Sequence, residues 1–132
     1  HGKLVKEKIS SLKKLGLNFG NAFQLNDDLA DFFDHLNSGK EKFKDLNEGK
    51  ITYPLIITMS CVDKDSKNNI SKLIEEKKFE AVFYEIEKNN GFNLTRLERD
   101  KAINNCIEYT KTLFKLDNVE LMESFLKNSL KA

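Results

Sequence analysis

The chain contains no tryptophan, a single proline and two cysteines in 132 residues. With so few helix breakers, many Leu, Lys and Glu residues, and no alternating runs of β-branched residues, the composition predicts an all-α domain. Apolar runs are short, and none approaches the roughly 20 residues that a membrane-spanning helix needs. We therefore expect a helical protein without a membrane span.

Neither sign of charge is in excess, because 22 Lys and Arg residues stand against 21 Asp and Glu residues. A protein that binds nucleic acid generally shows a clear basic excess, so we expect no nucleic-acid partner. Cys61 and Cys106 lack the spacing of a metal site, and two cysteines in a helical chain are more often reduced thiols than a disulfide. This use of cysteine makes the cytoplasm the expected location.

At this length we expect one all-helical unit. It should have three parts, which are a helical segment that ends in an acidic motif, a lysine-bearing loop and a set of packing helices: residues 1–36, 37–50 and 51–132. Two glycines, Gly16 and Gly20, are candidate breaks in the first part.

The third part begins with a strong helix-start signal. Thr52 is a suitable N-cap and Pro54 suits the first turn, and this helix should reach about Val62. The spacing of the remaining apolar residues predicts amphipathic helices over 70–89, with a break near Lys77, over 95–116 and over 119–130. A polar connection over 63–69 should precede them, and an Asn-Asn-Gly turn should lie at 89–91.

Four polar side chains share one face of the otherwise apolar first segment: Gln24, Asp27, Asp28 and Asp31. Like charges at i and i+4 cost about 0.2–0.5 kcal/mol even on an exposed helix, and burial raises that cost. Magnesium resolves the conflict, because it takes hard oxygen ligands and binds through one or two carboxylates plus substrate phosphate. The alternative is a solvated acidic face, although the surrounding Leu and Phe residues leave little of this helix suited to water.

Two Gly-Lys pairs follow the acidic face, Gly39-Lys40 and Gly49-Lys50. Lysine offers phosphate a point charge with three rotatable donors. A Gly-Lys pair is also common in solvated turns, and the spacing of an ATP-binding P-loop is absent. Carboxylates followed by these lysines predict a metal-bridged diphosphate site.

This stretch resembles the second aspartate-rich region of the trans-isoprenyl diphosphate synthases, the polyprenyl synthetase family, whose pattern is FQxxDDxxD and then GKxxxxDxxxGKxTxP. The chain matches it at twelve positions: Phe23, Gln24, Asp27, Asp28, Asp31, Gly39, Lys40, Asp45, Gly49, Lys50, Thr52 and Pro54. Two features depart from the family, which are a shortened loop after the acidic motif and Phe43 at a position where glycine is common.

The resemblance implies the C-terminal part of the isoprenoid synthase helical bundle and a magnesium-dependent prenyltransferase. Such an enzyme condenses an allylic diphosphate with isopentenyl diphosphate head to tail. By position, the catalytic residues would be Asp27, Asp28, Asp31 and Lys40. Asp27 would bind Mg2+ directly, and Asp28 and Asp31 would act on the metal through ordered waters. Gln24, Lys40 and Lys50 would contact the allylic diphosphate, and Asp45 would order the loop by pairing with a lysine.

The family's first aspartate-rich motif and its cationic isopentenyl diphosphate site are not in this sequence. The only arginines, Arg96 and Arg99, lie far downstream of the acidic motif and are not expected to replace that site. We therefore expect the chain to be inactive alone and to need an N-terminal half, a synthase subunit or a homodimer partner. The alternatives are a non-catalytic subunit of a full-length synthase and a helical scaffold with an incidental acidic face.

Overall fold

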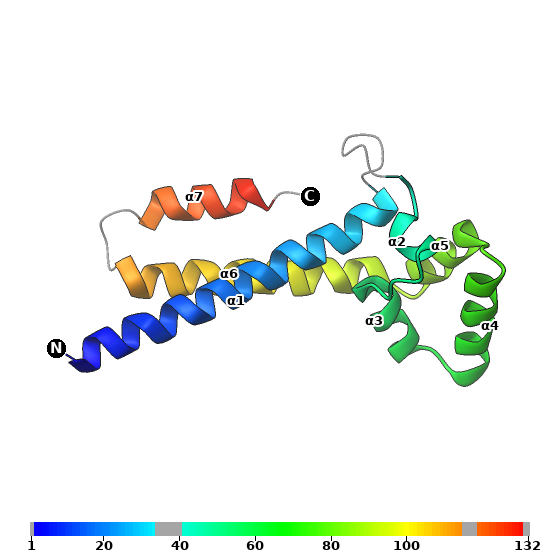
Figure 1. Cartoon of the computed structure of the whole chain (residues 1–132), viewed down its shortest axis with the longest axis horizontal. Helices are drawn as coiled ribbons and strands as arrows, with labels where there is room; N and C mark the ends of the chain where they lie inside the picture. Colours follow the sequence, from blue (N-terminus) through cyan, green and yellow to red (C-terminus); the bar gives the residue numbers. More distant parts are fainter. Residues whose placement is uncertain (1, 34–40, 115–118, 131–132) are drawn as a thin grey trace. The chain divides into compact units, whose positions relative to one another are not determined.

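The computed structural model describes residues 2–33, 41–114 and 119–130, and it describes side chains over these ranges except at 2–5, 119–122 and 124. Every regular element in these ranges is a helix (Figure 1), which confirms the expected all-α class. The elements are α1 (Gly2–Phe33), α2 (Lys44–Asn47), α3 (Tyr53–Cys61), α4 (Lys64–Glu75), α5 (Phe79–Lys88), α6 (Gly91–Phe114) and α7 (Val119–Ser129).

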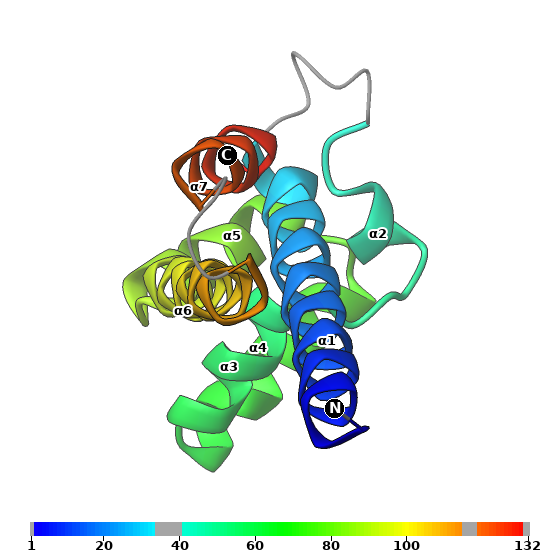
Figure 2. The same ribbon diagram turned by 90° about the vertical axis from the view of Figure 1, so that its left-hand side faces the viewer.

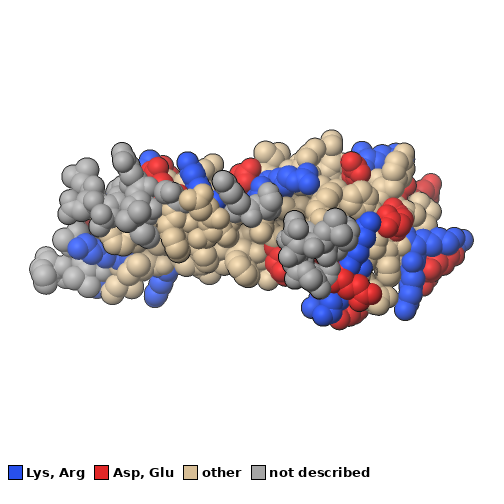
Figure 3. Space-filling model, turned by 90° about the horizontal axis from the view of Figure 1, so that it is seen from above, with Lys and Arg blue, Asp and Glu red and all other residues tan. Residues whose placement is uncertain are grey.

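The chain divides into two compact units, and the division falls within α1 and within α6. The motif unit comprises residues 27–97, and the outer-helix unit comprises residues 1–26 and 98–132. None of the described helices is long and apolar enough to cross a membrane. On the face shown in Figure 3, basic and acidic side chains lie among one another.

Phenylalanine dominates the core of the motif unit. Phe32 is 2% exposed, and its ring centroid lies 5.9 Å from that of Phe43 and 5.1 Å from that of Phe92. The other buried apolar members of this core come from α1, α2, α3, α4 and α5: Leu29, Leu46, Leu55, Ile70, Val82 and Ile86. Each buried aromatic pair adds roughly 0.5–1.5 kcal/mol beyond the area it buries, so this cluster anchors the end of α1.

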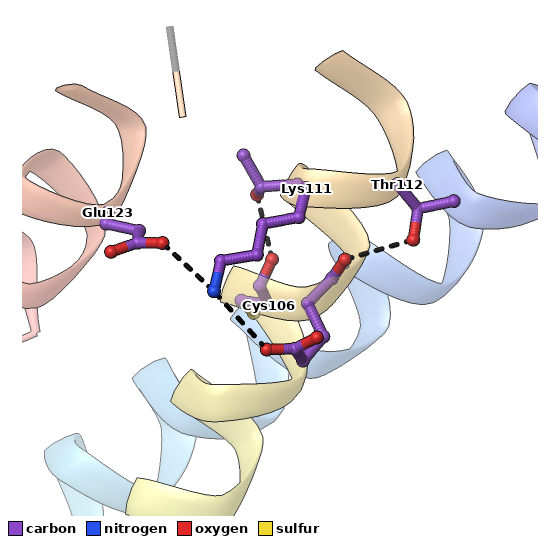
Figure 4. Close-up of polar contacts among 6 residues, drawn as sticks. Cys106, Lys111, Thr112 and Glu123 are labelled. Atoms are coloured by element: carbon purple, nitrogen blue, oxygen red, sulfur yellow. Dashed lines mark hydrogen bonds and ion pairs between the residues drawn. The ribbon is translucent and has the colours of Figure 1, made fainter. Parts of the chain in front are cut away.

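The core of the outer-helix unit is built from smaller clusters. Ala22 of α1 packs with Ala102 of α6 and with Leu130, and a second cluster joins α6 to Leu126 of α7. α7 runs alongside α6 in both ribbon views (Figures 1 and 2). Lys111 of α6 lies 3.7 Å from the Glu108 carboxylate and 3.4 Å from that of Glu123 in α7 (Figure 4). Small clusters of buried apolar side chains therefore hold this unit, with an ion pair at its surface.

Both cysteines are free thiols, as expected from the sequence. Cys61 is exposed, whereas Cys106 is buried in α6, and burial raises the pKa of the Cys106 thiol. The raised pKa makes Cys106 a poor nucleophile, because the thiolate is the reactive form.

Several helix boundaries differ from the sequence-based expectation. α1 is unbroken through both glycines, and the expected connection over 63–69 is mostly the first half of α4. Asp63 starts α4 early because its carboxylate accepts a hydrogen bond from the Ser66 amide at 2.8 Å. The break near Lys77 is confirmed, since Lys77 has a φ of 56° between α4 and α5. α2 lies within the stretch expected to be a loop.

Candidate functional site

Asp28 of α1 takes the place of a capping side chain for α3. It is 8% exposed, and its Oδ2 accepts a hydrogen bond from the Tyr53 amide at 3.0 Å, across 25 residues of sequence. The expected N-cap, Thr52, occupies the capping position, but its side chain makes no capping hydrogen bond. The first turn of α3 is therefore satisfied by an acceptor from another helix.

Asp31 has the same relation to α2. It is 1% exposed, and its Oδ1 accepts a hydrogen bond from the Asp45 amide at 2.9 Å. The N-cap position of α2 is Phe43, whose side chain cannot accept a hydrogen bond. The Asp31 carbonyl oxygen also accepts from the Phe43 amide at 3.0 Å, so Asp31 holds the loop through both its backbone and its side chain.

Asp45 connects this attachment to the second Gly-Lys pair. Its carbonyl accepts a hydrogen bond from the Lys50 amide at 2.9 Å, and its carboxylate lies 3.5 Å from Lys50 Nζ. Gly49 reverses the chain between them with a φ of 78°, a conformation that glycine adopts without strain. The expected pairing of Asp45 with a lysine is thus present, and Lys50 also lies 3.7 Å from Glu48.

Phe43 explains one departure from the family pattern. Its φ of 61° lies in the left-handed region, which glycine adopts readily and a side chain such as Phe adopts only at a cost. The Phe43 ring is nevertheless 7% exposed and packs with Phe32, Phe79 and Phe83. A backbone position that favours glycine therefore carries an aromatic anchor of the core in this chain.

The other predicted site residues are placed differently. Asp27 and Gln24 are exposed on α1, Gln24 at the end of the outer-helix unit and Asp27 at the start of the motif unit. The side chain of Lys50 is 63% exposed, and Lys40 lies outside the described residues.

The burial of Asp28 and Asp31 changes one premise drawn from the sequence, which was that a metal is required to make buried acids tolerable. Backbone amides satisfy one oxygen of each carboxylate, and hydrogen bonds of this kind stabilise a buried charge. Within the described ranges, no three acidic, His or Cys side chains are grouped as a complete metal site. Magnesium needs only one or two carboxylates plus phosphate, so exposed Asp27 fits a site that a phosphate ligand would complete.

Both arginines contact α1, which the sequence analysis did not anticipate. In the motif unit, the Arg96 guanidinium lies 5.1 Å from the Phe33 ring centroid. In the outer-helix unit, Arg99 Nη1 donates to Asn26 Oδ1 at 3.2 Å. A separation of 73 residues between Arg99 and Asn26 leaves no local pattern that could have revealed this pairing.

An apolar hollow of about 510 Å³ lies beside Lys50 in the motif unit, between the α2–α3 connection, α3 and α4. Its hydrocarbon wall includes Leu46, Leu55, Met59 and Ile74. Its volume falls in the range of small-molecule pockets. Among the described residues that line it, Lys50 is the only charged one.

Comparison with known proteins gives the family of the chain and a solved structure of similar fold. The family model described as Polyprenyl synthetase matches residues 2–87. The fold is similar to that of the crystal structure of polyprenyl synthetase from Streptomyces coelicolor A3(2), with a TM-score of 0.81 and 22% sequence identity. That match covers 95% of this chain but only 40% of the Streptomyces chain. Among curated proteins, none matches.

Proposed function

Because the chain belongs to the polyprenyl synthetase family, we propose that it is the C-terminal part of an isoprenyl diphosphate synthase. In this proposal it supplies the second aspartate-rich site of an enzyme that joins an allylic diphosphate to isopentenyl diphosphate. The observation that supports it most directly is the connected path from Asp31 through Asp45 to Lys50. This path links the acidic motif to a lysine that could bind a diphosphate.

We assign the roles at this site by exposure. Asp27 is exposed and would be the direct carboxylate ligand of magnesium, whereas Asp28 and Asp31 each have an oxygen engaged by a backbone amide and would support the site without binding the metal directly. Magnesium, when bound, supplies positive charge where negative charge builds on the departing diphosphate oxygens. Gln24, Lys40 and Lys50 would hold and orient that diphosphate.

A partner is required in this proposal, and the exposed apolar side chains of α1 support one. Ile9, Leu12, Leu17 and Phe23 are 47%, 53%, 68% and 61% exposed. Large apolar patches on a protein surface commonly mark interfaces. We propose that the partner is the remaining part of the synthase, a full-length synthase subunit or a second copy, and that the chain alone carries out no prenyl transfer.

Calorimetry tests the site without needing turnover. Titration of magnesium pyrophosphate into the 132-residue chain should give binding that requires magnesium and that Asp27→Ala abolishes. Asp65→Ala is the matched control, because Asp65 is another exposed acid on a helix of the motif unit, and it should bind as the wild type does. Binding that is indifferent to magnesium, or equal loss in both variants, would contradict the proposal.

An activity assay tests the need for a partner. The chain alone, given an allylic diphosphate, isopentenyl diphosphate and magnesium, should form no product, and sustained product formation would refute this part of the proposal. The non-catalytic subunit remains a second candidate, because the same exposed apolar side chains of α1 would serve it. That candidate is favoured if the chain raises the activity of an intact synthase while its Asp27→Ala variant does so equally well.

A further inference from the structure

We propose that the three aspartates of the acidic motif have different roles. Asp28 and Asp31 are positioning residues, because they cap α3 and α2 and thereby fix the loop that carries Lys50. Asp27, in contrast, faces the ligand. This inference rests on the proposed diphosphate site, because Lys50 is the group to be positioned. It predicts that the three aspartates respond differently to the same substitution.

The need for such caps follows from the helices themselves. The first-turn amides of a helix have no acceptor within it, and a nearby side chain usually supplies one. The residues at the capping positions, Phe43 and Thr52, make no side-chain capping bond to α2 or α3. The carboxylates of Asp31 and Asp28 accept from the amides of Asp45 and Tyr53 instead, at 2.9 and 3.0 Å.

These two bonds fix both ends of the segment that carries Lys50, residues 43–53. Asp31 holds its beginning, through the Asp45 amide and, by its own carbonyl, the Phe43 amide. Asp28 holds its end at Tyr53, three residues after Lys50. Between them, the Lys50 amide and ammonium are both tied to Asp45. The direction of Lys50 is therefore set by the two buried aspartates of α1.

Burial separates these two residues from Asp27. A hydrogen bond to a carboxylate that is 1% or 8% exposed is shielded from competing water, and losing the acceptor strands a buried amide at Asp45 and a half-buried one at Tyr53. Asparagine keeps an acceptor oxygen of similar reach but loses the negative charge. Asparagine should therefore replace a capping aspartate but should not replace an aspartate that binds magnesium.

Amide hydrogen exchange of the 132-residue chain, measured by NMR without metal or ligand, tests the capping directly. In Asp31→Ala, exchange at the Asp45 amide should accelerate by about tenfold or more, with the Tyr53 amide unchanged. In Asp28→Ala the pattern should reverse. The Asn variants should restore wild-type exchange, and Asp27→Ala should alter neither amide. Should an Ala variant not fold, slow exchange at both amides in the wild type and in the Asn variants supports the capping, whereas rapid exchange there refutes it.

Binding of magnesium pyrophosphate then tests the division of roles. Asp28→Asn and Asp31→Asn should keep the wild-type dissociation constant within about threefold, whereas Asp27→Asn should weaken binding by about tenfold or more. Equal weakening in all three, with the Asp45 amide still protected, would make the buried pair metal ligands and overturn the inference. Unchanged exchange in the Ala variants would also overturn it. If the exchange pattern holds but the wild type binds no magnesium pyrophosphate, the proposed function fails while the capping stands.

Discussion

The two units of this chain solve the problem of packing helices in different ways. Among the described residues, the buried carboxylates of Asp28, Asp31 and Asp45 all belong to the motif unit, where they sit beside a core of phenylalanine rings. The outer-helix unit buries the Thr110 hydroxyl against its own helix, and the ion pairs described for it lie at the surface. A buried charge requires partners at fixed positions, whereas an apolar contact accepts many side chains of similar volume.

This difference explains where sequence motifs occur. A carboxylate that caps a helix 14 or 25 residues away constrains the intervening spacing as well as the residue itself. The clusters around Ala22 and Leu126 constrain little more than size and polarity. The motif unit is therefore expected to respond sharply to small changes, and the outer-helix unit mildly.

The largest effect expected from a small change is at Gly91 in the motif unit. A Cβ at this position would lie 2.7 Å from Ile86 Cγ2 and 3.0 Å from the Pro54 carbonyl oxygen, and it would also collide with the Thr58 hydroxyl. Gly91→Ala should lower the free energy of unfolding by about 3 kcal/mol, because a well-packed core resists added volume. Urea denaturation followed by circular dichroism measures this change.

The matched control lies in the outer-helix unit. Gly20 is also in a helix, but a Cβ there would meet nothing within 4 Å. Gly20→Ala should raise the free energy of unfolding by roughly 0.5–1 kcal/mol through helix propensity alone. If both substitutions shift stability in the same direction, the contrast between the units is wrong.

The second effect concerns the left-handed backbone at Phe43. Phe43→Ala should cost about 3 kcal/mol through loss of the buried ring. Phe43→Gly should cost about 1 kcal/mol less than Phe43→Ala, because glycine relieves the strain of a positive φ. The ordinary order should return at Phe32, which lies within α1, where glycine should be worse than alanine by about 1 kcal/mol. Equilibrium unfolding of the four variants gives both differences, and the same order at both sites would argue against strain at Phe43.

The third effect concerns Asp63, the exposed N-cap of α4, which can be compared with the buried caps Asp28 and Asp31. The hydrogen bond from the Ser66 amide holds the pKa of the Asp63 carboxyl below its ordinary value of about 3.9. Because the folded-state pKa is the lower one, the stabilisation is present above pH of about 3.9 and is lost as the pH falls through the folded-state value. Thermal unfolding of the wild type should therefore approach that of Asp63→Ala on acidification, whereas Asp63→Asn, which caps without ionising, should show no such convergence.

Asp63→Ala also shows how burial changes the contribution of a cap. Asp63 is exposed, so water can replace its hydrogen bond to Ser66, whereas Asp31 is buried and its loss strands the Asp45 amide. At pH 7, Asp63→Ala should therefore destabilise the chain less than Asp31→Ala does. An equal loss would show that capping itself, and not burial, sets the size of the effect.

The sequence predicts the parts of this fold that depend on local signals. The all-α class, the helix start after Thr52, the break near Lys77 and the pairing of Asp45 with a lysine are all present. The start of α4 was missed because a strong N-cap, Asp63, lies in a stretch that is polar enough to suggest a loop. Local sequence signals thus predict the helices well, except where an N-cap lies in a stretch whose polar composition suggests a loop.

The remaining features depend on contacts between distant residues. Nothing in the sequence around Thr52 shows that Asp28 will replace its side chain as the cap of α3. The spacing of the acidic motif places its residues toward one side of α1, but the contrast between exposed Asp27 and the buried pair depends on how α2 and α3 pack. The contact of Arg99 with Asn26 likewise arises only when α6 packs beside α1 in the outer-helix unit.

The smallest effect is expected at the ion pair of the outer-helix unit. Lys111 is 48% exposed and Glu123 is 28% exposed, so water and salt screen their attraction. Glu123→Gln should lower the free energy of unfolding by about 0.2–1 kcal/mol in dilute buffer, and about 1 M salt should remove most of that difference. Glu108→Gln is the control, because it removes the other partner of Lys111 within the same helix. In contrast, the loss caused by Asp31→Ala should persist in salt, because it comes from a stranded amide that ions cannot reach. A salt-sensitive loss at Asp31 would mean that the buried carboxylate acts through long-range charge, and the distinction between the two units would then disappear.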